Sequence, residues 1–299
     1  MVRCIISKCL GGKAAAVLGL LSVFAASCNK VDSGDAVALE RIREIVFTAD
    51  VAESSLTKAT PVVSLTDFRV SATQGSAGSE TSAWNDVAFA LDHGFYVGNK
   101  FWPEDMDPVY HFYASNSHID FAAGGSTVDV DNSTDVVCAY LATSTYMSSN
   151  ALAFEHVFAR LGDVNITAAA GYTISGVSFR LTPYVGGTYN MRTGSGRTDR
   201  TGWSGLDSGS ETNIAPLGAG TKANDIFAVP GDYVLSCSWT ATEDDYSKSF
   251  NKDVDIRLVG GKVNTLNVTL GGDVSQIILG VSLAEWSDKP VDAGTFPII

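Results

Sequence analysis

The histidines of this chain are its first candidates for acid–base chemistry or metal binding. They are His93, His111, His118 and His156, and none lies at metal-ligand spacing from a cysteine or from another histidine. His111 and His156 lie in apolar stretches, which favours buried histidines that hydrogen-bond to neighbouring groups. The histidine pattern therefore indicates neither a metal site nor a catalytic base.

Acidic clusters and glycine-rich segments could supply two further kinds of chemistry. The acidic clusters, at residues 104–107, 129–131 and 243–245, are typical of solvated turns, and a calcium site around residues 129–133 would lack the glycine of an EF-hand loop. The glycine-rich segments, at residues 194–196 and 218–222, complete neither a P-loop nor a dinucleotide fingerprint. A glycoside hydrolase would need two carboxylates in one cleft, and the sequence names no such pair. We therefore expect a protein that is not an enzyme and has no cofactor and no metal.

The N-terminus has the pattern of an export signal. Arg3, Lys8 and Lys13 form a basic head, and the apolar run that follows, residues 14–26, is shorter than the roughly 20 residues that span a bilayer. Small residues then precede Cys28. We expect residues 1–27 to be removed during export.

Cys28 is the candidate for covalent modification. The segment Ala25-Ala26-Ser27-Cys28 resembles the lipobox of bacterial lipoproteins, whose cysteine is acylated and becomes the mature N-terminus. Two or more acyl chains, such as palmitate, would hold the protein stably at the outer membrane, with residues 28–44 as the tether. The alternative is an ordinary signal peptide followed by a cysteine with no such role.

Charge and length narrow the class of protein further. The chain has 299 residues and a net charge of −13, and loss of the three basic residues of the signal segment would make it −16. This charge disfavours nucleic acid and anionic lipid surfaces as partners. About 270 mature residues are enough for two domains.

The first predicted strand carries the main functional expectation. Ile45, Phe47, Ala49 and Val51 alternate with polar residues, as in a strand with one buried face. The loop after it, residues 53–64, is rich in serine and threonine and contains Lys58, so a trypsin-like protease could cut it. Removal of the first strand would leave a groove lined by apolar residues.

The remaining sequence predicts an all-β protein. Short β-branched and aromatic runs alternate with turn residues at the spacing of a β-sandwich, and no stretch sustains an amphipathic helix. We expect an N-terminal β-sandwich over residues 45–185, and a crossover with a C-terminal β-sandwich over residues 186–299. The crossover is expected to be ordered, the alternative being a disordered linker. Cys138 and Cys237 are expected as buried free thiols, the alternative being a disulfide.

Several motifs, in this order, give the chain a family resemblance. They are TKAT at 57–60, Trp84, YHFYASNS at 110–117, FEHVFARL at 154–161, GTYNMRTG at 187–194, PGDY at 230–233, GGKVNTLNVTL at 260–270 and VSLAEW at 281–286. Together they make the chain similar to the fimbrillin family, the lipoprotein subunits of type V pili (major and minor fimbriae).

The resemblance implies a fold, a processing step and a partner. Its members have two tandem transthyretin-like β-sandwich domains, and a trypsin-like protease removes the first strand so that a strand of another fimbrial subunit can replace it. The matching cleavage position is Lys58, where well-studied members carry arginine. Arg41 and Arg43 are the alternatives, but a cut there would leave the first strand attached. A cut subunit would belong to the stalk or tip of the fimbrium, and an uncut, lipid-bearing one would be an anchor or accessory protein.

A surface glycan-binding lipoprotein that never polymerises is the alternative function. Trp84, Trp102 and Trp203 could stack on sugar rings, although each could instead belong to a core. Saturable binding of oligosaccharides by the monomer would favour this alternative.

Overall fold

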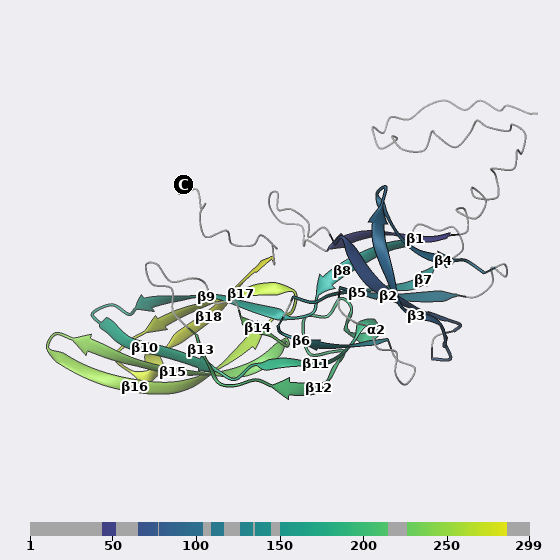
Figure 1. Cartoon of the computed structure of the whole chain (residues 1–299). Coiled ribbons are helices and arrows are strands. Elements are labelled where there is room, and N and C mark those ends of the chain that lie inside the picture. The colour runs from purple at the N-terminus through teal and green to yellow at the C-terminus, as the bar shows by residue number, and fades with distance from the viewer. Residues whose placement is uncertain are drawn as a thin grey trace, which may run out of the picture. The chain divides into compact units, whose positions relative to one another are not determined.

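Strands make up most of the part of the chain that the computed structural model describes, with almost no helix, which confirms the all-β expectation (Figure 1). The described residues are 44–51, 65–76, 78–103, 109–116, 126–133, 135–144, 150–214 and 226–285. The expected signal segment at residues 1–27, Cys28, the tether up to residue 43 and Lys58 lie outside them.

Seven strands form a closed barrel in the order β1-β4-β3-β2-β5-β7-β8. They are β1 (Glu44–Val51), β2 (Asp67–Gln74), β3 (Thr81–Asp92), β4 (Phe95–Phe101), β5 (Tyr110–Ser115), β7 (Val137–Ser144) and β8 (Asn150–His156). The alternation of side chains explains why these segments form strands with one face in the barrel. In β8, for example, Leu152 and Phe154 are buried and alternate with exposed or half-buried residues. The barrel interior is an aromatic core that includes Phe47, Phe89 and Phe112.

Eight further strands form two four-stranded sheets around a second core. One sheet has the order β14-β9-β17-β18 and the other the order β13-β10-β15-β16. The strands are β9 (Ala159–Ala168), β10 (Thr173–Leu181), β13 (Thr212–Ile214), β14 (Ile226–Ala228), β15 (Gly231–Glu243), β16 (Tyr246–Leu258), β17 (Lys262–Leu270) and β18 (Ile278–Glu285), with the short 3₁₀ helix η2 (Val274–Gln276) before β18. Trp239 is buried between them, stacks on Phe250 at 5.4 Å and donates to the Gly271 carbonyl at 2.9 Å.

A three-stranded sheet of order β12-β11-β6 packs on the outer side of the barrel through a third core. Its strands are β6 (Thr127–Asp131), β11 (Tyr184–Asn190) and β12 (Trp203–Ser208), and the single-turn helix α2 (Met191–Gly194) follows β11. Asn190 caps this helix by accepting the backbone N–H groups of Arg192 and Thr193. This core explains why every residue of β5 is buried, since one face of β5 lines the barrel and Tyr113 on the other face belongs to the third core.

Strand pairing crosses the domain boundary expected at residue 185. Strands β9 and β10, expected in the N-terminal sandwich, pair with β17 and β15 instead. Strand β6 likewise pairs with β11, so the pairings do not divide the chain at residue 185. The N-terminal strands also close into a barrel rather than remaining two separate sheets, because β1 pairs along both of its edges. The division into two tandem transthyretin-like sandwiches stays a prediction.

Three other expectations can be compared directly with the structure. Residues 186–214 lie in β11, α2, β12, β13 and the turns between them, so this part of the crossover is ordered. Cys138 and Cys237 are free and buried, as expected. The turn expected at residues 129–131 is wrong, because Asp129 and Asp131 lie in β6, and Asp129 accepts a hydrogen bond from Thr188 of β11 at 2.7 Å.

Candidate functional site: the seat of the first strand

Strand β1 connects the two ends of an otherwise open sheet. On one side it pairs antiparallel with β4, with a register shift between Glu44 and Val46. On the other side it pairs parallel with β8, from Phe47 opposite Asn150 to Val51 opposite Phe154. Figure 1 shows β1 beside β4 and β8. Because the barrel order passes from β8 to β4 only through β1, removal of β1 would open two unpaired edges.

The inward face of β1 fills the barrel core. Ile45 and Phe47 have no exposed surface, and Ala49 packs against the same cluster, which confirms the face expected from their alternation. The ring of Phe47 makes edge-on contacts with Phe89 at 4.9 Å and Phe112 at 5.0 Å between centroids. The seat of β1, meaning the side chains that it contacts inside the barrel, is therefore apolar and largely aromatic.

The polar contacts of β1 involve mainly its backbone. Besides the strand pairs, Asn150 donates from Nδ2 to the Val46 carbonyl at 3.0 Å and is itself 4% exposed. Val46 and Thr48, on the opposite face, are half-buried. A strand held by backbone hydrogen bonds and apolar side chains can be replaced by another strand with a similar alternation.

The chain returns to the core at Leu65, which is 9% exposed. Its carbonyl accepts a hydrogen bond from the hydroxyl of Tyr96 on β4. The candidate cleavage position Lys58 therefore lies in sequence between two anchored points, Val51 in β1 and Leu65. A cut at Lys58 would leave β1 bound to the barrel only by non-covalent contacts.

The sequence-predicted histidines occupy structural positions where the structure describes them. His111 is buried, and its Nδ1 lies 3.1 Å from the Tyr140 hydroxyl. His156 is also buried, and its Nδ1 lies 2.9 Å from Asp135. His93 is exposed, and His118 lies outside the described residues. Within the described ranges, no group of three or more histidine, cysteine or acidic side chains could hold a metal ion.

The three candidate sugar-stacking tryptophans belong to cores. Trp102 is 5% exposed and contacts Tyr110 edge-on at 5.4 Å. Trp84 lies in β3, half-buried against Phe89 at 5.8 Å. Trp203, half-buried in β12, packs within 5.3 Å of Phe158 and 5.2 Å of Tyr189. Packing explains all three positions.

Sequence reasoning missed an ion pair that joins the barrel to the crossover. Arg192 of α2 lies 2.5 Å from Glu80, donates to the Tyr113 hydroxyl at 2.5 Å, and has its Cζ 5.5 Å from the Tyr140 ring centroid. The hydrogen bond from Arg192 holds the pKa of Glu80 below its usual value. Of these residues, Arg192 and Tyr113 belong to the two motifs 187–194 and 110–117, which were the available signal.

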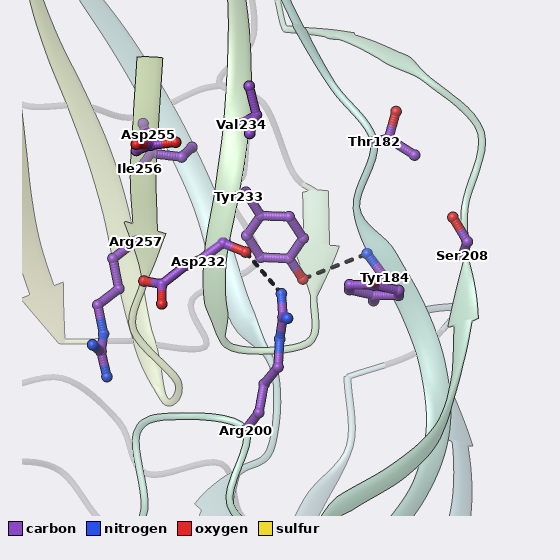
Figure 2. Close-up of a pocket in the computed structure, with 10 residues that line it drawn as sticks. All are labelled: Thr182, Tyr184, Arg200, Ser208, Asp232, Tyr233, Val234, Asp255, Ile256 and Arg257. Atoms are coloured by element: carbon purple, nitrogen blue, oxygen red, sulfur yellow. Dashed lines mark hydrogen bonds between the residues drawn. The ribbon is translucent and has the colours of Figure 1, made fainter. Parts of the chain in front are cut away.

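A cleft lies beside β15 and β16 of the sheet β13-β10-β15-β16, which does not contain β1 (Figure 2). Its volume is about 740 Å³. At its base Arg200 donates to the carbonyls of Pro230 and Asp232 at 3.0 and 2.9 Å. The guanidinium carbon lies 4.8 Å from the ring centroid of Tyr184 and 5.0 Å from that of Tyr233. No sequence pattern brings these residues together.

The class of protein follows from this geometry: an all-β protein whose first strand is both N-terminal and the closing strand of a barrel. Among the residues described, no helix is long and apolar enough to cross a membrane. The chain belongs to the fimbrillin-like family, whose model matches residues 57–286. Strand β1 precedes the matched region.

Solved structures of low sequence identity are similar to the chain over most of its length. A fimbrial protein from Bacteroides vulgatus is 14% identical, with a TM-score of 0.50, and the match covers 81% of this chain and 99% of that one. A candidate cell adhesion protein from Bacteroides ovatus is 15% identical, with a TM-score of 0.48 and coverage of 82% and 98%. A fimbrial assembly protein from Parabacteroides distasonis is 9% identical, with a TM-score of 0.37 and coverage of 81% and 98%. No curated protein sequence matches the chain.

Proposed function

We propose that this protein is a subunit, or an accessory or anchor component, of type V fimbriae, assembled by strand exchange and serving adhesion of the cell. Membership of the fimbrillin-like family supports a place in a surface appendage. The observation that carries the mechanism is the position of β1, which closes the barrel from the N-terminal side of the candidate cleavage site.

Burial of Ile45 and Phe47 gives the exchange its driving force. Each fully buried side chain of this size contributes about 1.5–3 kcal/mol, and backbone pairing along β4 and β8 adds to it. An emptied groove would expose this apolar surface together with two rows of unpaired N–H and C=O groups. A strand from another fimbrial subunit would restore both kinds of contact, and head-to-tail repetition of this step builds an open polymer.

The attachment to the outer membrane is part of the same proposal. Acylation of Cys28 would hold an uncut subunit at the membrane through the tether, whereas a cut after Lys58 followed by loss of β1 would release the mature chain from its lipid. An uncut protein would then anchor or assist the fimbrium, and a cut one would form its stalk or tip.

N-terminal sequencing of the protein taken from the cell surface tests the processing step. A start at Ala59 supports removal of β1, and an acylated, blocked Cys28 supports the anchor role. Lys58→Ala should abolish the Ala59 start, while the matched control Lys58→Arg should retain it with a protease that accepts both basic residues. Mass spectrometry of purified filaments tests the role itself. Absence of the chain from every filament of a strain that expresses it would contradict the proposal.

A further inference from the structure

The cleft of Figure 2 is part of a longer groove along β15. A second cavity of about 280 Å³ shares Thr182 and Val234 with it and extends to Ser236. From Asp232 to Ser236 the groove follows five residues of β15, roughly 13 Å at the rise of a strand. The main cleft, at about 740 Å³, lies within the size range of small-molecule sites.

Positively and negatively charged side chains both line this groove. The guanidinium groups of Arg200 and Arg257 line the cleft together with the carboxylates of Asp232 and Asp255. In the antiparallel pair of β15 and β16, Asp232 is opposite Arg257 and Val234 is opposite Asp255. The ligand would therefore meet both charges within one strand pair.

Side chains of both charges also line the second cavity. Arg180 forms an ion pair with Glu211 at 3.0 Å, and both side chains are about half exposed. Both residues line the cavity, and the hydroxyl-bearing residues Thr182 and Ser208 line the main cleft. Every part of the groove thus offers hydrogen-bond donors and acceptors.

Arg200 is held in a fixed position before any ligand arrives. Its Nε and Nη2 atoms donate to two backbone carbonyls, and the rings of Tyr184 and Tyr233 flank its guanidinium. The Tyr233 ring is in turn fixed, because its hydroxyl donates to the Val229 carbonyl at 2.5 Å. The remaining N–H groups of Arg200 can bind a ligand without loss of side-chain freedom.

These features select one chemical class of ligand. The two arginines and two aspartates of the cleft balance in formal charge, so the lining favours neither an anion nor a cation, and a neutral polar ligand fits it. Hydroxyl groups both donate and accept, and so pair with guanidinium and carboxylate groups at once. Val234, which is 53% exposed, adds an apolar surface in the middle of the groove. We propose that this groove binds a neutral carbohydrate, through polar contacts from Arg200, Asp232 and Asp255 and apolar contact with Val234.

The proposal goes beyond a role in fimbria assembly, since a subunit can polymerise without binding a sugar. The full chain, purified as a monomer in detergent, is applied to an array of neutral oligosaccharides ending in galactose, mannose or N-acetylglucosamine. The array also carries sialylated counterparts and a lysine-rich peptide. We expect saturable binding to a neutral glycan, confirmed by calorimetry, with a Kd between about 1 μM and 1 mM.

Matched variants assign the binding to the groove. Val234→Asp places a charge in the middle of the groove and should weaken binding at least tenfold, whereas Val274→Asp, at a 42% exposed position outside it, should have no effect. Asp255→Asn, which preserves shape, should weaken binding severalfold. The proposal is overturned by no binding at millimolar glycan, by binding confined to the sialylated or the lysine-rich probe, or by equal binding of wild type and Val234→Asp. None of these results bears on strand exchange.

Discussion

Replacement of Phe47 by alanine tests how strongly β1 is held in its seat. The side chain is fully buried and contacts Phe89 and Phe112 edge-on at 4.9 and 5.0 Å between centroids. A buried phenylalanine changed to alanine costs about 3–5 kcal/mol, and each aromatic pair contributes about 0.5–1.5 kcal/mol beyond its buried area. We expect Phe47→Ala to lower the free energy of unfolding by about 4–5 kcal/mol.

Val46→Ala is the matched control, because Val46 lies on the same strand and faces the other way. Being half-buried, it should cost about 1 kcal/mol or less. Unfolding in guanidinium chloride, followed by tryptophan fluorescence, gives both values. The two free energies can be compared if the dependence of the unfolding free energy on denaturant concentration is the same in both variants. If the two variants lost equal free energies of unfolding, the claim that the inward face of β1 fills the barrel core would be refuted.

Three further predictions concern the rest of the fold. Arg192 lowers the pKa of Glu80, so the stabilisation from this pair should be complete above the ordinary glutamate pKa and lost as the pH falls through the lowered one, and Glu80→Gln should remove this acid dependence of unfolding. Burial raises the pKa of Cys138 and of Cys237 to about 12. A thiol reagent at pH 8 should therefore label neither cysteine in the native protein, and both after denaturation without a reducing agent. Asn264 is fully buried and forms hydrogen bonds with the backbone of Arg160, Val259 and Lys262. We expect Asn264→Ala to lower the free energy of unfolding by about 2–4 kcal/mol.

Each of these predictions has a result that would contradict it. An acid limb of the stability curve that is identical in Glu80→Gln and wild type would show that the ion pair does not stabilise the fold. Two thiols that appear only after reduction would mean a disulfide. For Asn264, the control is Asn267→Ala on the same strand, a half-buried residue bonded to Ser282, and equal effects of the two changes would refute the buried hydrogen-bond network.

The position of β1 shows what sequence can and cannot predict. The alternation of Ile45 and Phe47 identifies the buried face, because a strand at the surface of a core must place every second side chain inward. It does not identify the partner strand. The parallel pairing with β8, which lies about a hundred residues later, depends on how the whole sheet closes. The barrel could therefore not be predicted from this stretch.

Strand β6 was missed for a different reason. Val128 and Val130 are buried and alternate with Asp129, which is the pattern of a strand, but aspartate is rare in strands and frequent in turns. Pairing with β11, and the hydrogen bond from Thr188 to Asp129, overcome this local preference. The preference of aspartate for turns was therefore outweighed by the pairing of β6 with β11.

The cleft around Arg200 could not be predicted from sequence at all. Its residues come from β11, β12, β15, β16 and the turns before β11 and β12, and no spacing along the chain links them. Only the pairing of β15 with β16 brings Asp232 and Asp255 into one cleft. The aromatic residues that did stand out in the sequence, Trp84 and Trp102, serve the barrel core instead.

The central claim, that β1 is a replaceable strand, is tested most directly by exchange with a peptide. The protein is cut with trypsin after Lys58, and a labelled synthetic peptide of residues 44–51 is added in excess. The account predicts that the peptide replaces the original strand and restores the stability of the uncut barrel, and that a peptide with Phe47→Ala binds at least about a hundredfold more weakly, as a loss of about 3–5 kcal/mol requires. Failure of the peptide to enter, or equal binding of the two peptides, would contradict it.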